Sequence, residues 1–212
     1  MARSTGRAPS APDGGADADE SRATRFMRSA LAILGETGRA DFTVLEVVER
    51  SKTSLRSFYQ HFASKDALLL ALIEKIMAES TQRWRAETDA LSPAEALRVL
   101  IARISAPAST TTQDSINRGL TFYNDHLAET VPGEYARVLS PVKVLIADII
   151  ERGIADGAFD ADLDVDPTAT LIMQSTMGAM RLRLLGAELN GEPLDGVHIY
   201  DFCIRALAAR PS

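Results

Sequence analysis

Residues 57–66, Ser-Phe-Tyr-Gln-His-Phe-Ala-Ser-Lys-Asp, gather rings and hydrogen-bonding groups in a short stretch of a chain with only 6% aromatic residues. A helix that only packs against a core spaces its large side chains by three and four positions. We expect Phe58 and Phe62 to point inward. We expect Tyr59 and His61 to face solvent, where a phenol and an imidazole can hydrogen-bond to a partner. The stretch therefore indicates a recognition surface carried by a helix.

Three short helices are predicted around this stretch, over residues 22–37, 44–50 and 54–61. Gly38 ends the first helix, and Thr43 caps the second, because Glu46 stands three residues later and completes a capping box. The segment Arg-Ser-Lys-Thr-Ser, residues 50–54, joins the second and third helices. Two short helices joined by a turn of three or four residues are typical of a helix-turn-helix. The second helix of that motif enters the DNA major groove, which predicts that residues 54–61 contact DNA.

The charge changes sign along the chain, although the net charge of the whole is −6. Residues 21–66 hold eight Lys or Arg against five Asp or Glu, a net of +3. Residues 67–212 hold thirteen basic and twenty acidic side chains, a net of −7. This asymmetry favours a DNA-binding domain over residues 21–66 and a larger domain with a different role over 67–212. Residues 1–20 are rich in Ala, Gly, Pro, Ser and Asp without apolar periodicity, and we expect them to form a disordered tail.

The remainder of the chain has the pattern of helices joined by short breaks. Ser64 and Ser92 are expected to cap two of them, with Pro93 in the first turn of the second. Helices are predicted over residues 64–87, 93–104, 114–128, 133–155, 167–185 and 197–209. No stretch alternates polar and β-branched residues as a strand would. The predicted fold class is all-α, with about nine helices.

The composition excludes several classes of protein. With 46% hydrophobic and 25% charged residues, the chain can bury a core. No window comes near ~18 uninterrupted apolar residues, so no membrane partner is expected. The N-terminus carries arginines without an apolar stretch behind them, unlike a secretory signal. Cys203 is the only cysteine and cannot form an internal disulfide, which favours a reducing cytoplasm.

The segment from Phe26 to Leu72 resembles the TetR family of bacterial transcriptional regulators. Its elements come in the family's order and spacing: Gly38 after an apolar helix, Thr43-Val44, Tyr59 with Phe62, and Ser64-Lys65-Asp66 followed by Leu68. The turn departs from the pattern, because Ser51-Lys52-Thr53-Ser54 stands where the family usually has Ala-Gly-Val-Ser. Glycine suits a positive φ, so either Lys52 carries roughly 1 kcal/mol of strain there or the turn is shaped differently.

The resemblance implies that the partner is a double-stranded DNA operator. Phosphate contacts are expected from Thr43, Tyr59 and Lys65, which offer a hydroxyl, a phenol and an ammonium near helix starts. Base contacts are expected above all from Arg56, because arginine to guanine is the commonest specific base contact. Arg56 and His61 could instead be ordinary solvated side chains, Lys65 could only favour the start of a helix, and Tyr59 could be a core aromatic. The other residues expected at the interface are Lys52, Thr53, Ser54, Leu55, Ser57, Gln60 and His61.

By the same resemblance, the later helices enclose a ligand cavity. Its aromatic, methionine and few polar candidates favour a mostly apolar small molecule as effector. These candidates are Trp84, Ile104, Phe122, Tyr123, His126, Leu145, Ile149, Met173 and Met177. Any one of them could belong to the core instead, and His126 could be a satisfied core histidine.

The resemblance also implies that residues 67–212 form a ligand-binding and dimerisation domain whose last two long helices pair with a second copy of the chain. Apolar and small side chains at helical spacing give each of them a stripe that allows close approach. The interface candidates are Leu171, Ser175, Gly178, Leu182, Leu185, Ile199, Phe202, Cys203 and Ala206. Alternatively, both stripes belong to the intramolecular core.

Together these features predict a ligand-responsive repressor that binds a palindromic operator as a homodimer. The alternative is a helical enzyme or small-molecule carrier whose helix-turn-helix is incidental. No nucleophile elbow, Walker loop or dinucleotide glycine motif is found, so we expect neither enzymatic activity nor a cofactor. The acidic run at residues 160–166 lacks the glycine and final glutamate of a calcium loop, so no metal is expected.

Overall fold

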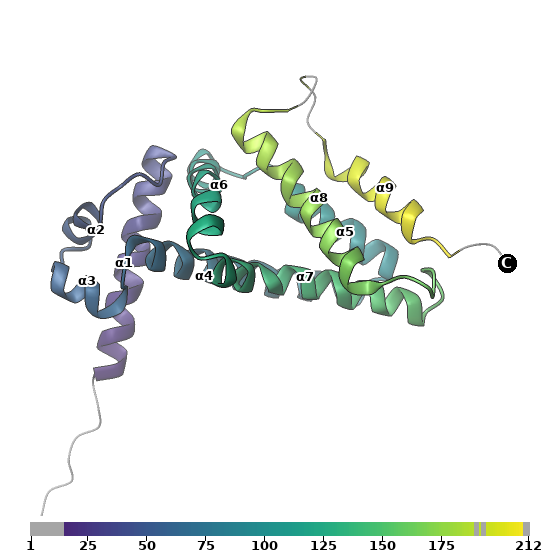
Figure 1. The fold of residues 1–212 in the computed structure, drawn as a ribbon, viewed down its shortest axis with the longest axis horizontal. Coiled ribbons are helices and arrows are strands. Elements are labelled where there is room, and N and C mark those ends of the chain that lie inside the picture. Colours follow the sequence, from purple (N-terminus) through teal and green to yellow (C-terminus); the bar gives the residue numbers. More distant parts are fainter. Residues whose placement is uncertain (1–14, 189–190, 192–193, 210–212) are drawn as a thin grey trace, which may run out of the picture.

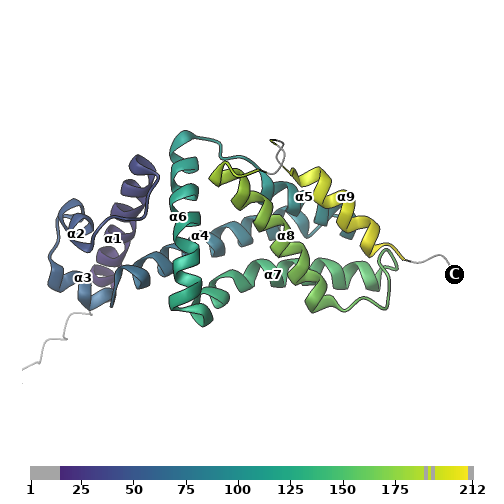
Figure 2. The ribbon, with the colours of Figure 1, turned by 45° about the horizontal axis from the view of Figure 1, so that its top comes forward.

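The computed structural model describes residues 15–188, 191 and 194–209, and over these residues the chain forms α-helices and no β-strand (Figure 1). The all-α prediction is confirmed. Helices α1 to α3 and the start of α4 form one end of an elongated molecule, and α5, α7, α8 and α9 form the other (Figure 2). The helices are α1 (Gly15–Thr37), α2 (Val44–Ser51), α3 (Leu55–His61), α4 (Lys65–Thr88), α5 (Pro93–Ser105), α6 (Thr111–Thr130), α7 (Pro132–Ala155), α8 (Val165–Leu185) and α9 (Gly196–Leu207).

The aromatic cluster builds the core of the N-terminal end. Phe58 on α3 is fully buried, and its ring lies edge-on to the ring of Phe26 on α1, with 5.3 Å between the centroids. Phe62 is also buried, with its ring centroid 6.3 Å from that of Phe26. Edge-to-face pairs at such distances add attraction to the burial of apolar area. The inward orientation predicted for Phe58 and Phe62 is therefore confirmed.

Tyr59 and His61, the two polar rings of the cluster, behave differently. Tyr59 is 58% exposed, as the sequence predicts. His61 is only half-exposed, and its ring centroid lies 6.1 Å from that of Phe26, so the prediction of an outward-facing imidazole is wrong. His61 follows Phe58 by three residues, and that spacing puts both side chains on one face of the helix.

Side-chain caps hold the ends of the short helices. The Thr43 hydroxyl accepts a hydrogen bond from the Glu46 amide at 3.2 Å, and the Glu46 carboxylate accepts one from the Thr43 amide at 2.6 Å. This is the capping box that the sequence predicts. Ser54 and Ser64 cap α3 and α4 in the same manner, each accepting from an amide three residues later. Each cap satisfies an amide that has no partner within its own helix.

The turn between α2 and α3 bends at Lys52, whose backbone is left-handed with φ 53° and ψ 47°. No other non-glycine residue in the described part of the chain has a positive φ. The Lys52 amide donates to the Glu49 carbonyl at 3.1 Å, and the Arg25 guanidinium from α1 donates to the Ser51 carbonyl at 2.6 Å. The turn therefore has the conformation that a glycine adopts without strain, and of the two alternatives left by the sequence, Lys52 adopts the left-handed one.

Helix α4 belongs to both ends of the molecule, since its first turns pack against α1 and its later turns against α5 and α7 (Figure 1). Helix α6 lies against α1, and Gly119 permits this approach. A Cβ on Gly119 would lie 2.7 Å from the Leu34 side chain. Leu120 and Leu127 of α6 consequently belong to the same core as Phe58. The domain boundary predicted after residue 66 stays a prediction, but the N-terminal core extends across it.

The first helix begins earlier than predicted. α1 starts at Gly15 instead of residue 22, so it includes the end of the segment expected to be a disordered tail. Alanine favours helix, and carboxylates favour the helix N-terminus, which accounts for the early start in Ala-Asp-Ala-Asp-Glu. The rest of that tail, residues 1–14, lies outside the described residues.

Two other helix starts also differ. α6 begins at Thr111 instead of residue 114, because Thr110 caps it by accepting a hydrogen bond from the amide of the third helical residue. The Ser92 side chain makes no cap to α5, contrary to prediction, although Pro93 does open that helix. Nowhere in the described ranges is a helix both long and apolar enough to cross a bilayer.

Replacement of Lys52 tests the left-handed turn. Lys52→Gly relieves the strain but adds freedom to the unfolded chain, so we expect a free energy of unfolding equal to wild type or up to about 1 kcal/mol higher. Lys52→Val puts a β-branched side chain at φ 53°, so we expect a loss of more than about 1 kcal/mol. Urea denaturation measures both values. A valine variant as stable as the glycine variant would contradict the left-handed turn.

Candidate functional site

Helix α3 presents a polar face to solvent. Phe58 is buried beneath it, and the positions that helical periodicity places on the opposite side are exposed. The Arg56 guanidinium makes no hydrogen bond or ion pair with any described residue, so all five of its donors are available. The exposed positions are Leu55, Arg56, Tyr59 and Gln60, with Ser57 half-exposed.

The start of α2 is exposed next to this face. The Thr43 hydroxyl already donates to the Glu46 carboxylate at 2.8 Å. Hydrogen bonds from the Thr43 amide and hydroxyl lower the pKa of Glu46, so its carboxyl group is ionised at neutral pH. A phosphate at Thr43 would therefore approach a carboxylate as well as a hydroxyl. The contact expected from Thr43 stays a prediction.

The turn residues have structural roles of their own. The Thr53 and Ser51 hydroxyls lie 2.6 Å apart and share a hydrogen bond, and the Ser54 hydroxyl caps α3. Lys52 projects from the exposed bend between the helices. These groups lie at the same end as Arg56, and their contacts with DNA are untested.

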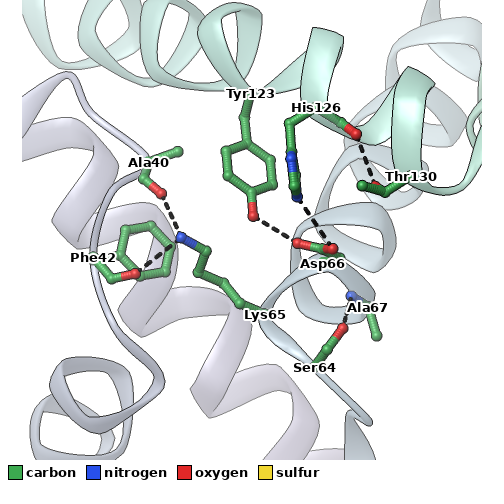
Figure 3. A network of polar contacts seen from close by, with 9 residues as sticks. All are labelled: Ala40, Phe42, Ser64, Lys65, Asp66, Ala67, Tyr123, His126 and Thr130. Atoms are coloured by element: carbon green, nitrogen blue, oxygen red, sulfur yellow. Dashed lines mark hydrogen bonds and ion pairs between the residues drawn. The ribbon is translucent and has the colours of Figure 1, made fainter.

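Lys65 lies in a different environment from the one the sequence suggests. Its ammonium donates to the carbonyls of Ala40 and Phe42, at 3.0 and 3.2 Å, and the residue is half-buried (Figure 3). The ammonium also lies 4.9 Å from the centroid of the Tyr123 ring, a cation–π distance. Two of its three donors are thus used inside the protein, which does not favour the predicted phosphate contact.

A cavity of about 680 Å³ opens between α4, α6 and α8. Met77, Trp84, Ile104 and Met177 supply apolar surface, so three of the nine predicted cavity residues, Trp84, Ile104 and Met177, do line it. The sequence prediction omitted Met77, although it lies seven residues before Trp84, two helical turns away on the same face.

The cavity also has a polar part. Arg83 lines it without an ion pair to any described carboxylate, and the Arg103 Nε donates to the Glu87 carboxylate at 2.6 Å. The Asn124 Oδ1 is buried and has no hydrogen-bond partner among the described residues. A buried carbonyl without a hydrogen-bond partner destabilises the protein, and a ligand that donates a hydrogen bond to it removes this cost. The cavity therefore has more polar side chains in its lining than the nine residues predicted from the sequence would supply.

Six predicted cavity residues lie elsewhere. Phe122 is 58% exposed on the outer surface of α6, and Tyr123 and His126 point toward Asp66 (Figure 3). Helix α6 turns other positions toward the cavity, among them Leu120, Thr121 and Asn124, so a sequence list without the helix rotation could not separate them. The remaining three, Leu145, Ile149 and Met173, are buried in the core of the other end, where the first two also border a separate cavity of about 260 Å³.

The outer face of α8 and α9 carries large apolar side chains in solvent. Leu171 is 68% exposed, Leu182 38% and Phe202 72%. Gly178 is open, because a Cβ there would meet no atom within 4 Å. Ser175 and Ala206 are exposed on this face as well, and Leu185 is half-buried at its end.

Two predicted interface residues face the opposite way. Ile199 and Cys203 are buried against the core of their own chain, 4% and 5% exposed, so the intramolecular alternative holds for them. Burial raises the pKa of the Cys203 thiol, as expected of a packed apolar side chain. Val197, which the sequence prediction omitted, is 65% exposed on α9.

Three comparisons place the chain among known proteins. Residues 26–72 match the family model "Bacterial regulatory proteins, tetR family". The HTH-type transcriptional repressor KstR2 of Mycolicibacterium smegmatis is 25% identical over 177 residues, which cover 81% of this chain and 84% of that protein. The HTH-type transcriptional repressor NicS of Pseudomonas putida is 27% identical over 154 residues, 69% of each chain.

A solved structure shares the fold. The TetR-family repressor FadR of Thermus thermophilus, in complex with lauroyl-CoA, superposes with a TM-score of 0.68 at 18% identity, over 90% of this chain and 97% of that chain. The fold and the exposed α3 define a helix-turn-helix transcriptional regulator. The matched N-terminal segment and the similarity to these repressors support a TetR-family transcriptional regulator.

The exposed guanidinium of Arg56 gives the second prediction. Arg56→Ala should weaken binding to a duplex that the wild-type protein selects from a random-sequence library by about 1–3 kcal/mol, with relaxed preference at one base pair. Arg98→Ala is the matched control, since it removes an exposed arginine on α5 that is paired with Glu95. Fluorescence anisotropy with the selected duplex and its single-base variants measures both. Equal losses on every sequence would remove Arg56 from base reading.

Proposed function

We propose that the protein is a ligand-responsive repressor that binds a palindromic operator as a homodimer and is released by a mostly apolar small molecule. One observation carries this proposal: α4 begins beside the helix-turn-helix at Lys65 and reaches the cavity at Trp84. At 1.5 Å per residue, these positions lie roughly 28 Å apart along one helix. A ligand that tilts the helix at Trp84 must displace its other end. The proposed place of action is the cytoplasm, where the operator would be.

The cavity chemistry supports an effector with an apolar body. Methionine side chains adapt to varied apolar shapes, and Met77, Met177 and Met180 flank Trp84 in the cavity wall. Arg83 and Asn124 could bind a polar group at one end of such a molecule. The related FadR structure holds lauroyl-CoA, which combines an apolar chain with a polar head. No observation in the described part of the chain favours the alternative of an enzyme or carrier.

The energy required for release is modest. A ligand that binds the released state about a hundredfold more tightly than the DNA-bound state shifts the equilibrium by roughly 2.7 kcal/mol. In a dimer the two recognition helices must match half-sites about 34 Å apart, so a small tilt of each α4 disturbs both. A change of this size is sufficient to release an operator.

The third prediction concerns the dimer. A Cβ at Gly178 would meet no atom within 4 Å, so Gly178→Arg should leave the monomer fold intact and disrupt pairing across α8 and α9. We expect monomers in sedimentation equilibrium and at least about a hundredfold weaker operator binding, since each half-site binds weakly alone. Gly133→Arg, at an equally open glycine on α7, is the control and should stay dimeric. A dimeric Gly178→Arg variant would place the interface elsewhere.

The fourth prediction uses Trp84, the only tryptophan in the chain. A compound that enters the cavity should shift its fluorescence emission and weaken operator binding by about a hundredfold. Lauroyl-CoA, lauric acid and dodecanol form a first panel with one apolar chain and three polar ends. Trp84→Phe is the control: the emission change disappears while the release of DNA, followed by anisotropy, persists. Compounds that bind at Trp84 and leave DNA affinity unchanged would indicate a constitutive repressor.

A further inference from the structure

The first two residues of α4 reach in different directions. The Lys65 side chain reaches back to the loop between α1 and α2, and the Asp66 side chain reaches across to α6 (Figure 3). Three segments that are far apart in the sequence therefore meet at one point. No feature of the proposed DNA face or cavity accounts for this meeting.

Lys65 fixes the loop that precedes α2. Its ammonium donates to the Ala40 and Phe42 carbonyls, and it lies 5.5 Å from the centroid of the Phe42 ring. Phe42 is buried and is directly followed by Thr43, the cap of α2. A change at Lys65 is therefore transmitted within one residue to the start of the helix-turn-helix.

Asp66 fixes the start of α4 to α6. Its Oδ1 accepts a hydrogen bond from the Tyr123 hydroxyl at 2.6 Å, and its Oδ2 lies 3.3 Å from the His126 Nε2. Burial, together with the hydrogen bond to Asp66, raises the pKa of Tyr123 well above its ordinary value. The phenol therefore stays protonated and acts as the donor at neutral pH.

Tyr123 joins the two halves of this arrangement. The face of its ring lies 4.9 Å from the Lys65 ammonium while its hydroxyl binds Asp66, so one side chain contacts both residues. The next residue, Asn124, lines the cavity on another face of the same helix. Helix α6 thus has the cavity on one side and this contact on another.

We propose that Tyr123 is a positioning residue for DNA binding: through Lys65 and Asp66 it fixes the start of α2 and of α4 relative to α6. Lys65 then contributes to DNA affinity through the placement of the loop and not through contact with a phosphate. This inference rests on the proposed function, because it requires that the helix-turn-helix bind DNA.

Salt dependence separates placement from contact. A lysine that neutralises a phosphate releases a counterion. Its loss therefore makes the negative slope of log affinity against log salt shallower by about 1. A lysine that only positions the loop changes affinity and leaves that slope as it was. Lys75→Met, on the exposed side of α4, corrects for the loss of one positive charge.

The experiment compares Lys65→Met, Tyr123→Phe and the double variant on a duplex selected by the wild-type protein from a random-sequence library. Tyr123→Phe keeps the ring and removes only the bond to Asp66, so we expect about three- to tenfold weaker binding, the equivalent of one hydrogen bond. Lys65→Met should weaken binding at least as much as Tyr123→Phe does. Its slope of log affinity against log salt should equal that of Lys75→Met. The double variant should bind within about twofold of Lys65→Met alone, because neighbours that act together are not additive.

Two controls isolate the positioning role from general stability. Tyr135→Phe removes a half-buried phenol on α7 whose hydroxyl has no hydrogen bond to a described residue, and should bind DNA as wild type. Hydrogen exchange in the free proteins should be faster at residues 38–48 in Tyr123→Phe than in Tyr135→Phe, and equal in α8. If Lys65→Met does not fold, Lys65→Gln, which keeps a donor for the carbonyls, replaces it in the salt titration.

Each outcome decides the matter. A slope lower by about 1 in the Lys65 variant, relative to Lys75→Met, would show direct phosphate contact and overturn the inference alone. Wild-type affinity and exchange in Tyr123→Phe would overturn it as well. A library selection that enriches no sequence would refute the proposed function, and the positioning role would fall with it.

Discussion

Phe58 has no exposed surface, and its edge-on contact with Phe26 fixes the rotation of α3 about its own axis. A helix of seven residues is too short to be stable alone, so α3 depends on this burial and on the Ser54 cap. Once Phe58 points inward, the helical period dictates that Arg56 and Gln60 point outward. The chemistry of the exposed face is therefore set by a residue that cannot touch DNA. The same contact brings the His61 ring close to Phe26 of α1 and leaves the residue only half-exposed.

Helix α4 transmits this arrangement to the rest of the chain. Its buried leucines pack under α1, and Lys65 and Asp66 at its start bind the α1–α2 loop and α6. The basic N-terminal end and the acidic remainder share one rigid helix, and the net charges of +3 and −7 favour DNA at one end only. A ligand in the cavity contacts the later turns of that helix and one face of α6. Both helices that border the cavity, α4 and α6, also carry the contact among Lys65, Asp66 and Tyr123.

Helix α9 is apolar on two faces for two different reasons. Ile199 and Cys203 complete the core of their own chain, while Phe202 on α9 and Leu171 on α8 are 72% and 68% exposed. Contiguous exposed apolar surface of this kind is typical of an interaction site in a folded protein. The open backbone at Gly178 lets a second helix approach closely. A pairing surface built on α8 and α9 would lie at the opposite end of the molecule from α3 (Figure 1).

The sequence by itself determined where the helices begin and end, because caps and breakers act within one helical turn. Helical periodicity and the Thr43–Glu46 capping box predicted the short helices correctly, while the shape of the turn at Lys52 stayed open until the structure gave its left-handed backbone. Nine helices were expected, and each was found with most ends within three residues, since caps and breakers act over a single turn.

Tertiary structure decided which face of each helix borders the cavity, which is buried in the core and which is exposed. The apolar residues of α6 and α9 were identified from sequence, but their division between cavity, core and exposed surface depends on how each helix is rotated against its neighbours. Lys65 shows the same limit: its type and its place at a helix start suit a phosphate equally well. Only the tertiary structure brings the Ala40 and Phe42 carbonyls, more than twenty residues away in sequence, within hydrogen-bond distance of the ammonium.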